Sequence, residues 1–166
     1  DLRNRLAPAD RRCYAFFHPQ LVDEPLIFVE VALTKAVPDA IGPLLDLSRP
    51  VIKAQDANTA VFYSISNTQK GLGGISFGNF LIKQVVEELK QELPNLQTFV
   101  TLSPVPGFAA WLKRERASDE SHFDATQKDT LALLDTEGWW RDAASAERLR
   151  EVLLAAAAYY FLVARD

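Results

Sequence analysis

A strand, a glycine-rich loop and an amphipathic helix follow one another without a break, and this succession most restricts what the chain can fold into. The apolar run of residues 59–66 predicts the strand, and four glycines lie within the eight residues 71–78. Apolar side chains then recur every three or four residues over 80–93, which predicts a helix that buries one face. With strands predicted on either side, this alternation favours an α/β sheet.

Two further strands and a helical tail surround this unit. Residues 25–34 are almost continuously apolar, as in a strand covered on both faces. Residues 97–102 predict a strand that ends where two prolines and a glycine stop ladder pairing. Alternate side chains of the strand at 59–66 should point to opposite faces of the sheet, with Val61, Tyr63 and Ile65 on one face and Phe62, Ser64 and Ser66 on the other. Helices are expected over 108–116, over 125–136 and from about 142 to 165.

The 166 residues have the length of one ordinary domain, and we expect three parts within it. Residues 1–24 form a lead-in from an upstream part, residues 25–116 form the α/β core, and residues 117–166 form a helical extension of the same domain. The chain contains no methionine, which indicates processing or a piece of a longer protein.

Composition excludes several classes of protein. Eighteen basic against twenty-two acidic side chains give a net charge of −4, and no basic stripe predicts a nucleic-acid partner. One cysteine, Cys13, excludes an internal disulfide framework and a cysteine-based zinc site, and two histidines leave little room for a histidine-rich centre, so we expect no metal. The longest apolar run, thirteen residues at 152–164, is shorter than the roughly 20 residues of a membrane-spanning helix. With no targeting signal, we expect a cytoplasmic location, with an organelle as the open alternative, and no membrane partner.

The glycine loop can bind a phosphate group, because glycines let several backbone N–H groups and a helix N-terminus face one anion. It matches neither GxxxxGK[ST] nor a clean GxGxxG. It lies nearer to the Q/R-x-x-G-x-G/A pyrophosphate loop of acetyltransferase-like folds, with Gly71 and Gly73 in place and Thr68 where glutamine or arginine would stand. A flexible turn before the helix is the equal alternative.

Ser103 follows the third predicted strand, where its hydroxyl could donate to a molecule bound at the sheet edge. A turn serine bonded to its own backbone is the more frequent case. No G-x-S-x-G motif supports acyl-enzyme chemistry. We read His18 and His122 as surface residues and Cys13 as inert.

Three stretches resemble the catalytic domain of the malonyl-CoA decarboxylase family, over residues 12 to about 112. They are HPQLVDEPLIFVEVALT (18–34), AVFYSIS followed by TQKGLGGISFGNFLIKQVVEEL (60–89), and TFVTLSPVPGF (98–108). The most specific parts are LSPVPGF and Gly74-x-x-x-Gly78-x-Phe80-Leu-Ile-Lys83.

The resemblance implies an acetyltransferase-like (GNAT-type) mixed sheet with flanking helices, preceded by a helical domain. It also implies conversion of malonyl-CoA to acetyl-CoA and carbon dioxide without a metal or organic cofactor, and a homo-oligomer. The family's catalytic serine falls on Ser103, which also contacts malonyl-CoA. Its thioester-binding stretch falls on Gly73, Gly74, Ile75, Ser76, Phe77, Gly78 and Asn79.

Two departures from the family pattern stand out. Some relatives carry an acidic residue at the position of Ser76. The family's catalytic histidine lies in a motif resembling N-P-V-x-x-F-H-x-x-N-G-A, which residues 1–166 do not contain, and neither His18 nor His122 takes its role. The chain by itself is therefore expected to lack the proton donor. An acyl-CoA-dependent acyltransferase and a non-catalytic acyl-CoA-binding fragment remain the alternatives.

Overall fold

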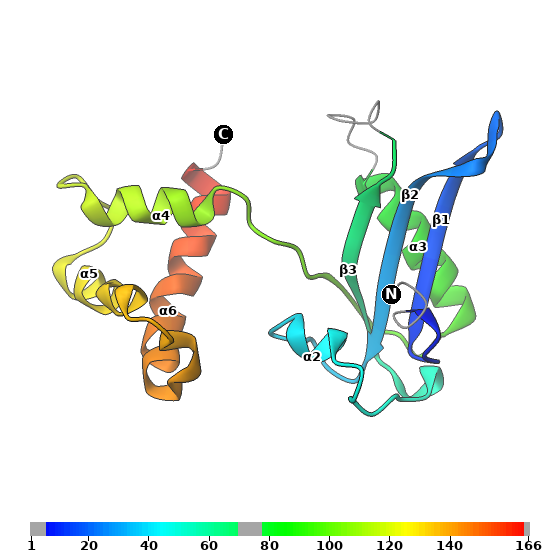
Figure 1. Ribbon diagram of the computed structural model, residues 1–166, viewed down its shortest axis with the longest axis horizontal. Helices are drawn as coiled ribbons and strands as arrows, with labels where there is room; N and C mark the ends of the chain where they lie inside the picture. The colour runs from blue at the N-terminus through cyan, green and yellow to red at the C-terminus, as the bar shows by residue number, and fades with distance from the viewer. Residues whose placement is uncertain (1–5, 70–77, 165–166) are drawn as a thin grey trace. The chain divides into compact units, whose positions relative to one another are not determined.

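The computed structural model of the chain describes residues 6–69 and 78–164, which form two compact units (Figure 1). The first unit ends at Ser103 and the second begins at Pro104. The expected boundary between residues 116 and 117 is therefore wrong, because the helix at 108–117 packs with the helices that follow it.

A mixed four-stranded sheet forms the first unit, in the order β1-β2-β3-β4. Strands β1 (Arg11–His18), β2 (Leu21–Thr34) and β3 (Thr59–Asn67) are antiparallel neighbours, and β4 (Thr98–Thr101) pairs in parallel with β3. Helix α3 (Gly78–Glu92) connects the two parallel strands. The short helices α2 (Gly42–Leu45) and η1 (Ala54–Asp56) lie in the link from β2 to β3.

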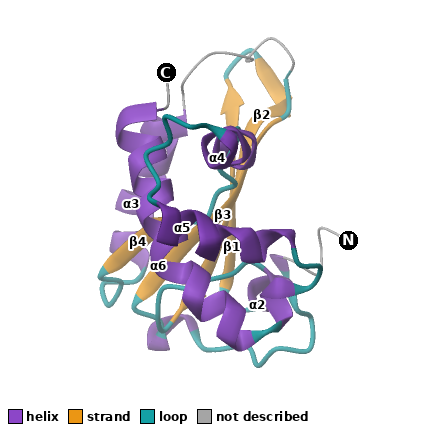
Figure 2. Cartoon of the chain, turned by 90° about the vertical axis from the view of Figure 1, so that its left-hand side faces the viewer, coloured by secondary structure: helices purple, strands orange, loops and turns teal. Residues whose placement is uncertain are grey.

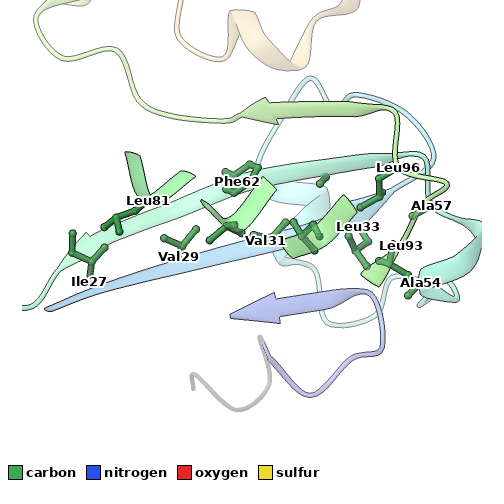
Figure 3. Close-up of a cluster of buried hydrophobic side chains, with 13 residues drawn as sticks. Ile27, Val29, Val31, Leu33, Ala54, Ala57, Phe62, Leu81, Leu93 and Leu96 are labelled. Carbon is green, nitrogen blue, oxygen red and sulfur yellow. The ribbon is translucent and has the colours of Figure 1, made fainter. Parts of the chain in front are cut away.

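Helix α3 covers one face of the sheet, as its apolar spacing predicts. Leu81, Val85 and Leu89, four residues apart along the helix, are buried with side chains of β2 and β3. Figure 3 shows this cluster, with Leu81 of α3 near Ile27 and Phe62. The strand residues of this cluster include Ile27, Val29, Val31, Leu33, Ala60 and Phe62. Burial of these side chains supplies the main stabilisation of the unit.

The opposite face of the sheet has its own smaller apolar cluster. Ala32, Val61 and Tyr63 are buried there with Leu44 of α2. Strand β2 is thus buried on both faces, which confirms the expectation from its continuous apolar run.

The pairing of β2 with β3 changes register at Tyr63. Val31 lies opposite Phe62, but the preceding residue, Glu30, lies opposite Ser64, so Tyr63 is the extra residue of a β-bulge. Because cross-strand partners share a face, Ser64 lies on the same face as Glu30, away from α3. The predicted strict alternation is therefore wrong from Ser64 onward.

Ile65 changes face for the same reason. It lies opposite Val29, whose side chain packs against α3, and not with Val61 and Tyr63. A bulge of this kind depends on the partner strand, which the alternation pattern of a single strand does not contain.

The expected lead-in is wrong for residues 11–24, which form β1 and the start of β2. Strand β1 is an edge strand: Tyr14 and Phe16 pack toward α3, while its remaining side chains are polar or partly exposed. The Arg12 guanidinium also contacts Glu92 of α3, with Nη2 and Oε1 at 2.6 Å. A strand covered on one face only has fewer apolar residues, so it is harder to recognise in the sequence than a strand buried on both faces.

Helices make up the second unit, with no strand among its described residues (Figure 2). They are α4 (Phe108–Ala117), α5 (Ala125–Leu131), the 3₁₀ turns η3 (Ala132–Asp135) and η4 (Trp139–Arg141), α6 (Ala143–Tyr159) and a final π-turn, η5 (Tyr160–Ala164). Trp111, Leu131, Leu149 and Tyr160 are buried in one core. No helix in the described part of the chain has the length and apolar character needed to cross a membrane.

Candidate active site at the ends of two parallel strands

Strands β3 and β4 stay paired over only a short distance. The pairing runs from Thr59 opposite Thr98 to Phe62 opposite Thr101. The Leu102 N–H then donates to the Phe62 carbonyl oxygen at 2.9 Å. Beyond this bond β4 no longer pairs with β3 within the described residues, whereas β3 runs on to Asn67. One end of the sheet is therefore open between the two strands.

Three chain segments meet at this end because of the parallel connection. The carboxyl end of β3, the amino end of α3 and the carboxyl end of β4 all lie at the same edge of the sheet. Ligands of α/β sheets bind outside the carboxyl ends of parallel strands, and the N-terminus of a helix favours an anion there.

The predicted site residues are distributed over this edge. Gly73, Gly74, Ile75, Ser76 and Phe77 lie outside the described residues. Gly78 and Asn79 are the first two residues of α3. Ser103 lies two residues beyond the end of β4 and is exposed. The fold thus brings Ser103 and the start of α3 to one edge.

Thr68 follows the last residue of β3 and is hydrogen-bonded to β2. Its backbone N–H donates to the Leu26 carbonyl oxygen at 2.9 Å, and its hydroxyl donates to the Pro25 carbonyl oxygen. The next residue, Gln69, donates from its side chain to Glu24 at 3.2 Å. Thr68 therefore cannot substitute for the glutamine or arginine of the acetyltransferase-like pattern, because its only hydroxyl proton is already donated to β2.

The two histidines are exposed, as expected. The Nδ1 atom of His18 accepts a hydrogen bond from the Gln20 N–H at 3.1 Å, in the turn between β1 and β2. His122 belongs to the second unit, where its Nδ1 lies 3.0 Å from Oε2 of Glu115 and its Nε2 contacts the Tyr159 hydroxyl. The hydrogen bond from His122 lowers the pKa of Glu115.

Cys13 lies on β1, opposite Glu30 of β2. Burial, with the nearby Glu30 charge, raises the pKa of its thiol. A raised pKa reduces the thiolate fraction, so the expectation that Cys13 is inert is consistent with its surroundings. In the described ranges, no group of three or more histidine, cysteine, aspartate or glutamate side chains is arranged to hold a metal ion.

Comparison with known proteins identifies the family. The family model "Malonyl-CoA decarboxylase C-terminal domain" matches residues 1–166. The chain belongs to the malonyl-CoA decarboxylase family. Among curated members, mitochondrial malonyl-CoA decarboxylase of Anser anser anser is 35% identical over 182 residues, and the mouse (Mus musculus) protein is 44% identical over 115 residues. These alignments cover 96% and 68% of the chain.

Solved structures of the family share this fold. The crystal structure of malonyl-CoA decarboxylase from Rhodopseudomonas palustris matches all of the chain, with 69% sequence identity and a TM-score of 0.90. The structure from Cupriavidus metallidurans matches 99% of it, with 40% identity and a TM-score of 0.71. The chain covers only 38% and 42% of those two structures, and 36% of the goose relative. It thus spans somewhat more than a third of the length of these relatives.

Sequence reasoning did not single out two features of this unit. One is Ser64, which the bulge at Tyr63 places on the face opposite α3. The other is a buried charged cluster of Asp10, Arg11 and Arg49. The only sequence signal for Ser64 is the change from apolar residues to alternating serines in the second half of β3.

Proposed function

We propose that this chain supplies the acyl-CoA-binding part of a malonyl-CoA decarboxylase, which converts malonyl-CoA to acetyl-CoA and carbon dioxide. The observation that carries the proposal is the family match over residues 1–166, with Ser103 at the open end of β3 and β4. The GNAT-type assignment of the fold is part of the proposal. The antiparallel β1, β2 and β3, followed by the parallel β3–α3–β4 unit, support it.

Binding of coenzyme A would use the amino end of α3. We assign its pyrophosphate to the stretch from Gly73 to Asn79, because unpaired N–H groups and the helix dipole favour an anion at a helix N-terminus. Pantetheine would then pass along β3 beyond Phe62, where β4 has stopped pairing. Binding energy from these remote groups holds the acyl end near Ser103.

The reaction breaks the bond between the carboxylate carbon and the methylene carbon of the malonyl group. The electron pair of this bond moves into an enolate of the thioester, and carbon dioxide leaves. Hydrogen-bond donors aimed at the developing charge lower the barrier. The thioester itself accepts the electron pair, so the proposed reaction requires neither a metal nor an organic cofactor.

Ser103 is proposed to hydrogen-bond the malonyl carboxylate from the end of β4. A general acid must then protonate the methylene carbon. His18 and His122 are both engaged elsewhere, in the β1–β2 turn and with Glu115 and Tyr159. We therefore assign this proton to the histidine motif that the family resemblance implies, which residues 1–166 do not contain.

We also propose that the protein is a cytoplasmic homo-oligomer. Leu154, Leu162 and Val163 of the last helical segment are between 62% and 84% exposed, and apolar side chains of this kind gather at subunit contacts. The animal relatives are named as mitochondrial proteins. Light scattering after size exclusion tests the oligomeric state, and cell fractionation tests the location.

Mass-spectrometric detection of acetyl-CoA tests the proposed activity. Malonyl-CoA is incubated with the 166-residue chain and with a longer protein that contains it. Ser103→Ala should lower kcat of the longer protein by a factor of about 100 or more. Ser48→Ala is the matched control, because Ser48 is an exposed serine in the link that precedes the opposite end of β3.

The same experiment distinguishes the decarboxylase from the acyltransferase and from the non-catalytic acyl-CoA-binding fragment. Transfer of the acyl group to an added amine would identify an acyltransferase. Binding of acetyl-CoA without product from either protein would identify a non-catalytic binding module. A Ser103→Ala variant with unchanged kcat would remove Ser103 from the mechanism.

A further inference from the structure

A row of polar side chains crosses the sheet on the face opposite α3. Cys13 of β1 lies opposite Glu30 of β2, and Glu30 lies opposite Ser64 of β3. Cross-strand partners of antiparallel strands have Cβ atoms about 4.5–5.5 Å apart, so the three side chains are neighbours. The row interrupts a face on which Ala32, Val61 and Tyr63 are buried.

The row ends at Ser64, beside the open end of β3 and β4. Phe62 is the last residue of β3 that pairs with β4, and its partner is Thr101. Ser64 lies two residues beyond Phe62 along β3, and Ser103 lies two residues beyond Thr101, where β4 ends. The hydrogen bond from the Leu102 N–H to the Phe62 carbonyl oxygen holds the two segments together up to the residue before Ser103. Ser64 and Ser103 therefore both lie at the open end of the sheet, just beyond the last pair between β3 and β4.

The bulge at Tyr63 determines which face Ser64 occupies. Phe62 packs toward α3, so strict alternation would turn Ser64 toward α3 as well. The extra residue, Tyr63, turns Ser64 to the opposite face instead. Bulges re-aim side chains in this way and are frequent beside active sites. This conformation places a half-buried hydroxyl at the open end of the sheet, where an apolar residue would satisfy the strand pattern equally well.

We propose that Ser64 is a second substrate-contacting hydroxyl of this site, a proposal that rests on the proposed function. Ser64 donates a hydrogen bond to the thioester oxygen of the malonyl group, while Ser103 binds the carboxylate. When the bond to the carboxylate carbon breaks, its electron pair moves onto the thioester oxygen as the enolate forms. The hydrogen bond from Ser64 strengthens at that moment, so it lowers the barrier more than it tightens substrate binding.

Ser66 offers a comparison within the same strand. It lies on the same strand, with its Oγ 3.5 Å from the Oγ of Ser64, and is exposed. It is two residues farther from the last β3–β4 pair. A hydroxyl required only for the local polarity or stability of β3 would make Ser64→Ala and Ser66→Ala behave alike.

The test uses the longer protein with malonyl-CoA as substrate. Ser64→Ala should lower kcat by a factor of about 10–100 and leave KM within about twofold, which is the pattern of a transition-state contact. Ser48→Ala, outside the proposed binding path, should retain wild-type kcat, whereas Ser66→Ala should affect KM more than kcat because pantetheine would pass this part of β3. The side chains of threonine and valine have nearly the same shape, but only threonine carries a hydroxyl. Ser64→Thr should therefore retain most of the wild-type kcat, whereas Ser64→Val should not.

Three results would overturn the assignment. Ser64→Ala with wild-type kcat would do so, as would a rise in KM alone. If Ser64→Ala does not fold, equal kcat values for Ser64→Thr and Ser64→Val would have the same meaning. A wild-type protein that binds malonyl-CoA without decarboxylating it would instead refute the proposed function, and the role of Ser64 with it.

Discussion

The guanidinium group of Arg49 binds the carboxylate of Asp10 through two hydrogen bonds, of 2.6 and 2.9 Å, although 39 positions separate the two residues. Asp10 is 1% exposed. The buried Arg11 lies 3.3 Å from the same carboxylate and donates to the Leu44 carbonyl oxygen at 2.6 Å. This cluster joins the start of β1 to the link that carries α2.

Removing the carboxylate of this cluster should destabilise the first unit strongly. Asp10→Asn leaves two guanidinium groups without their counter-ion, and breaking a buried ion pair costs about 3–5 kcal/mol of the free energy of unfolding. Urea unfolding measures the loss. Asp46→Asn, at an exposed aspartate of the same link, should change stability by about 0.5 kcal/mol or less. Equal effects of the two substitutions would contradict the role given to the cluster.

The Asp10 carboxylate should also make the free energy of unfolding depend on pH in the acid range. Burial alone would raise the pKa of Asp10, but hydrogen bonds from Arg49 and the Ile52 N–H, with the charges of Arg11 and Arg49, lower it below 3.8. The contribution to stability is therefore complete above the unfolded-state pKa and is lost as pH falls through the folded-state pKa. Unfolding curves between pH 2 and 6 should show a loss in the wild type that is smaller in Asp10→Asn.

The Tyr14 phenol should ionise only at high pH, and its ionisation should destabilise the fold. Burial, and then the negative charge of Glu92, raise the pKa of its phenol to about 12. Its contribution is present below the unfolded-state pKa of about 10 and is lost as pH rises through the folded value. Absorbance at about 295 nm should show a phenol that titrates near pH 12 and disappears in Tyr14→Phe. A Tyr14→Phe spectrum with the same late transition would assign it to another tyrosine.

Gly107 and Gly138 form a matched pair in the second unit. Both have positive φ, of 81° and 78°, where an L side chain costs about 1–2 kcal/mol. A Cβ on Gly107 would also lie 2.6 Å from the Tyr160 hydroxyl oxygen, while one on Gly138 would meet nothing within 4 Å. Gly107→Ala should therefore lower the thermal midpoint more than Gly138→Ala. Equal losses would mean that Tyr160 moves aside without cost.

The start of α5 depends on a capping box. The Asp124 carboxylate accepts from the Gln127 N–H at 2.8 Å, and the Gln127 side chain accepts from the Asp124 N–H at 3.0 Å. Asp124→Ala should cost about 1 kcal/mol in the free energy of unfolding. Asp129→Ala, within the same helix, is the control and should cost less. Chemical denaturation of both variants would show whether the cap contributes.

Local patterns predicted several elements of the first unit. The helix at 80–93 corresponds to α3, because its apolar residues recur at the helical period and bury one face. The strand at 25–34 corresponds to most of β2, because burial on both faces leaves a continuous apolar run. The position of Ser103 after the last strand followed from the prolines that end β4.

Other features depend on contacts with distant segments of the chain, which the local sequence pattern does not show. Strand β1 has a mixed pattern because only its α3-facing residues, such as Tyr14 and Phe16, are well covered. The bulge at Tyr63 is a mismatch between β2 and β3, so the face of Ser64 depends on two strands at once. The boundary at residue 103 depends on the packing of Trp111 with Leu131 and Leu149 in the second core.

The sequence by itself determined the periodicities of the chain, and with them the type and order of most elements. It also carried the motifs around Gly74, Gly78 and Ser103 that are typical of the family. Tertiary structure alone decided which residues distant in the chain meet, as Asp10 does with Arg49 and Ser64 with Glu30. The physical reason is that periodicity records whether a side chain is buried, whereas register and ion pairing depend on contacts between segments that fold onto one another.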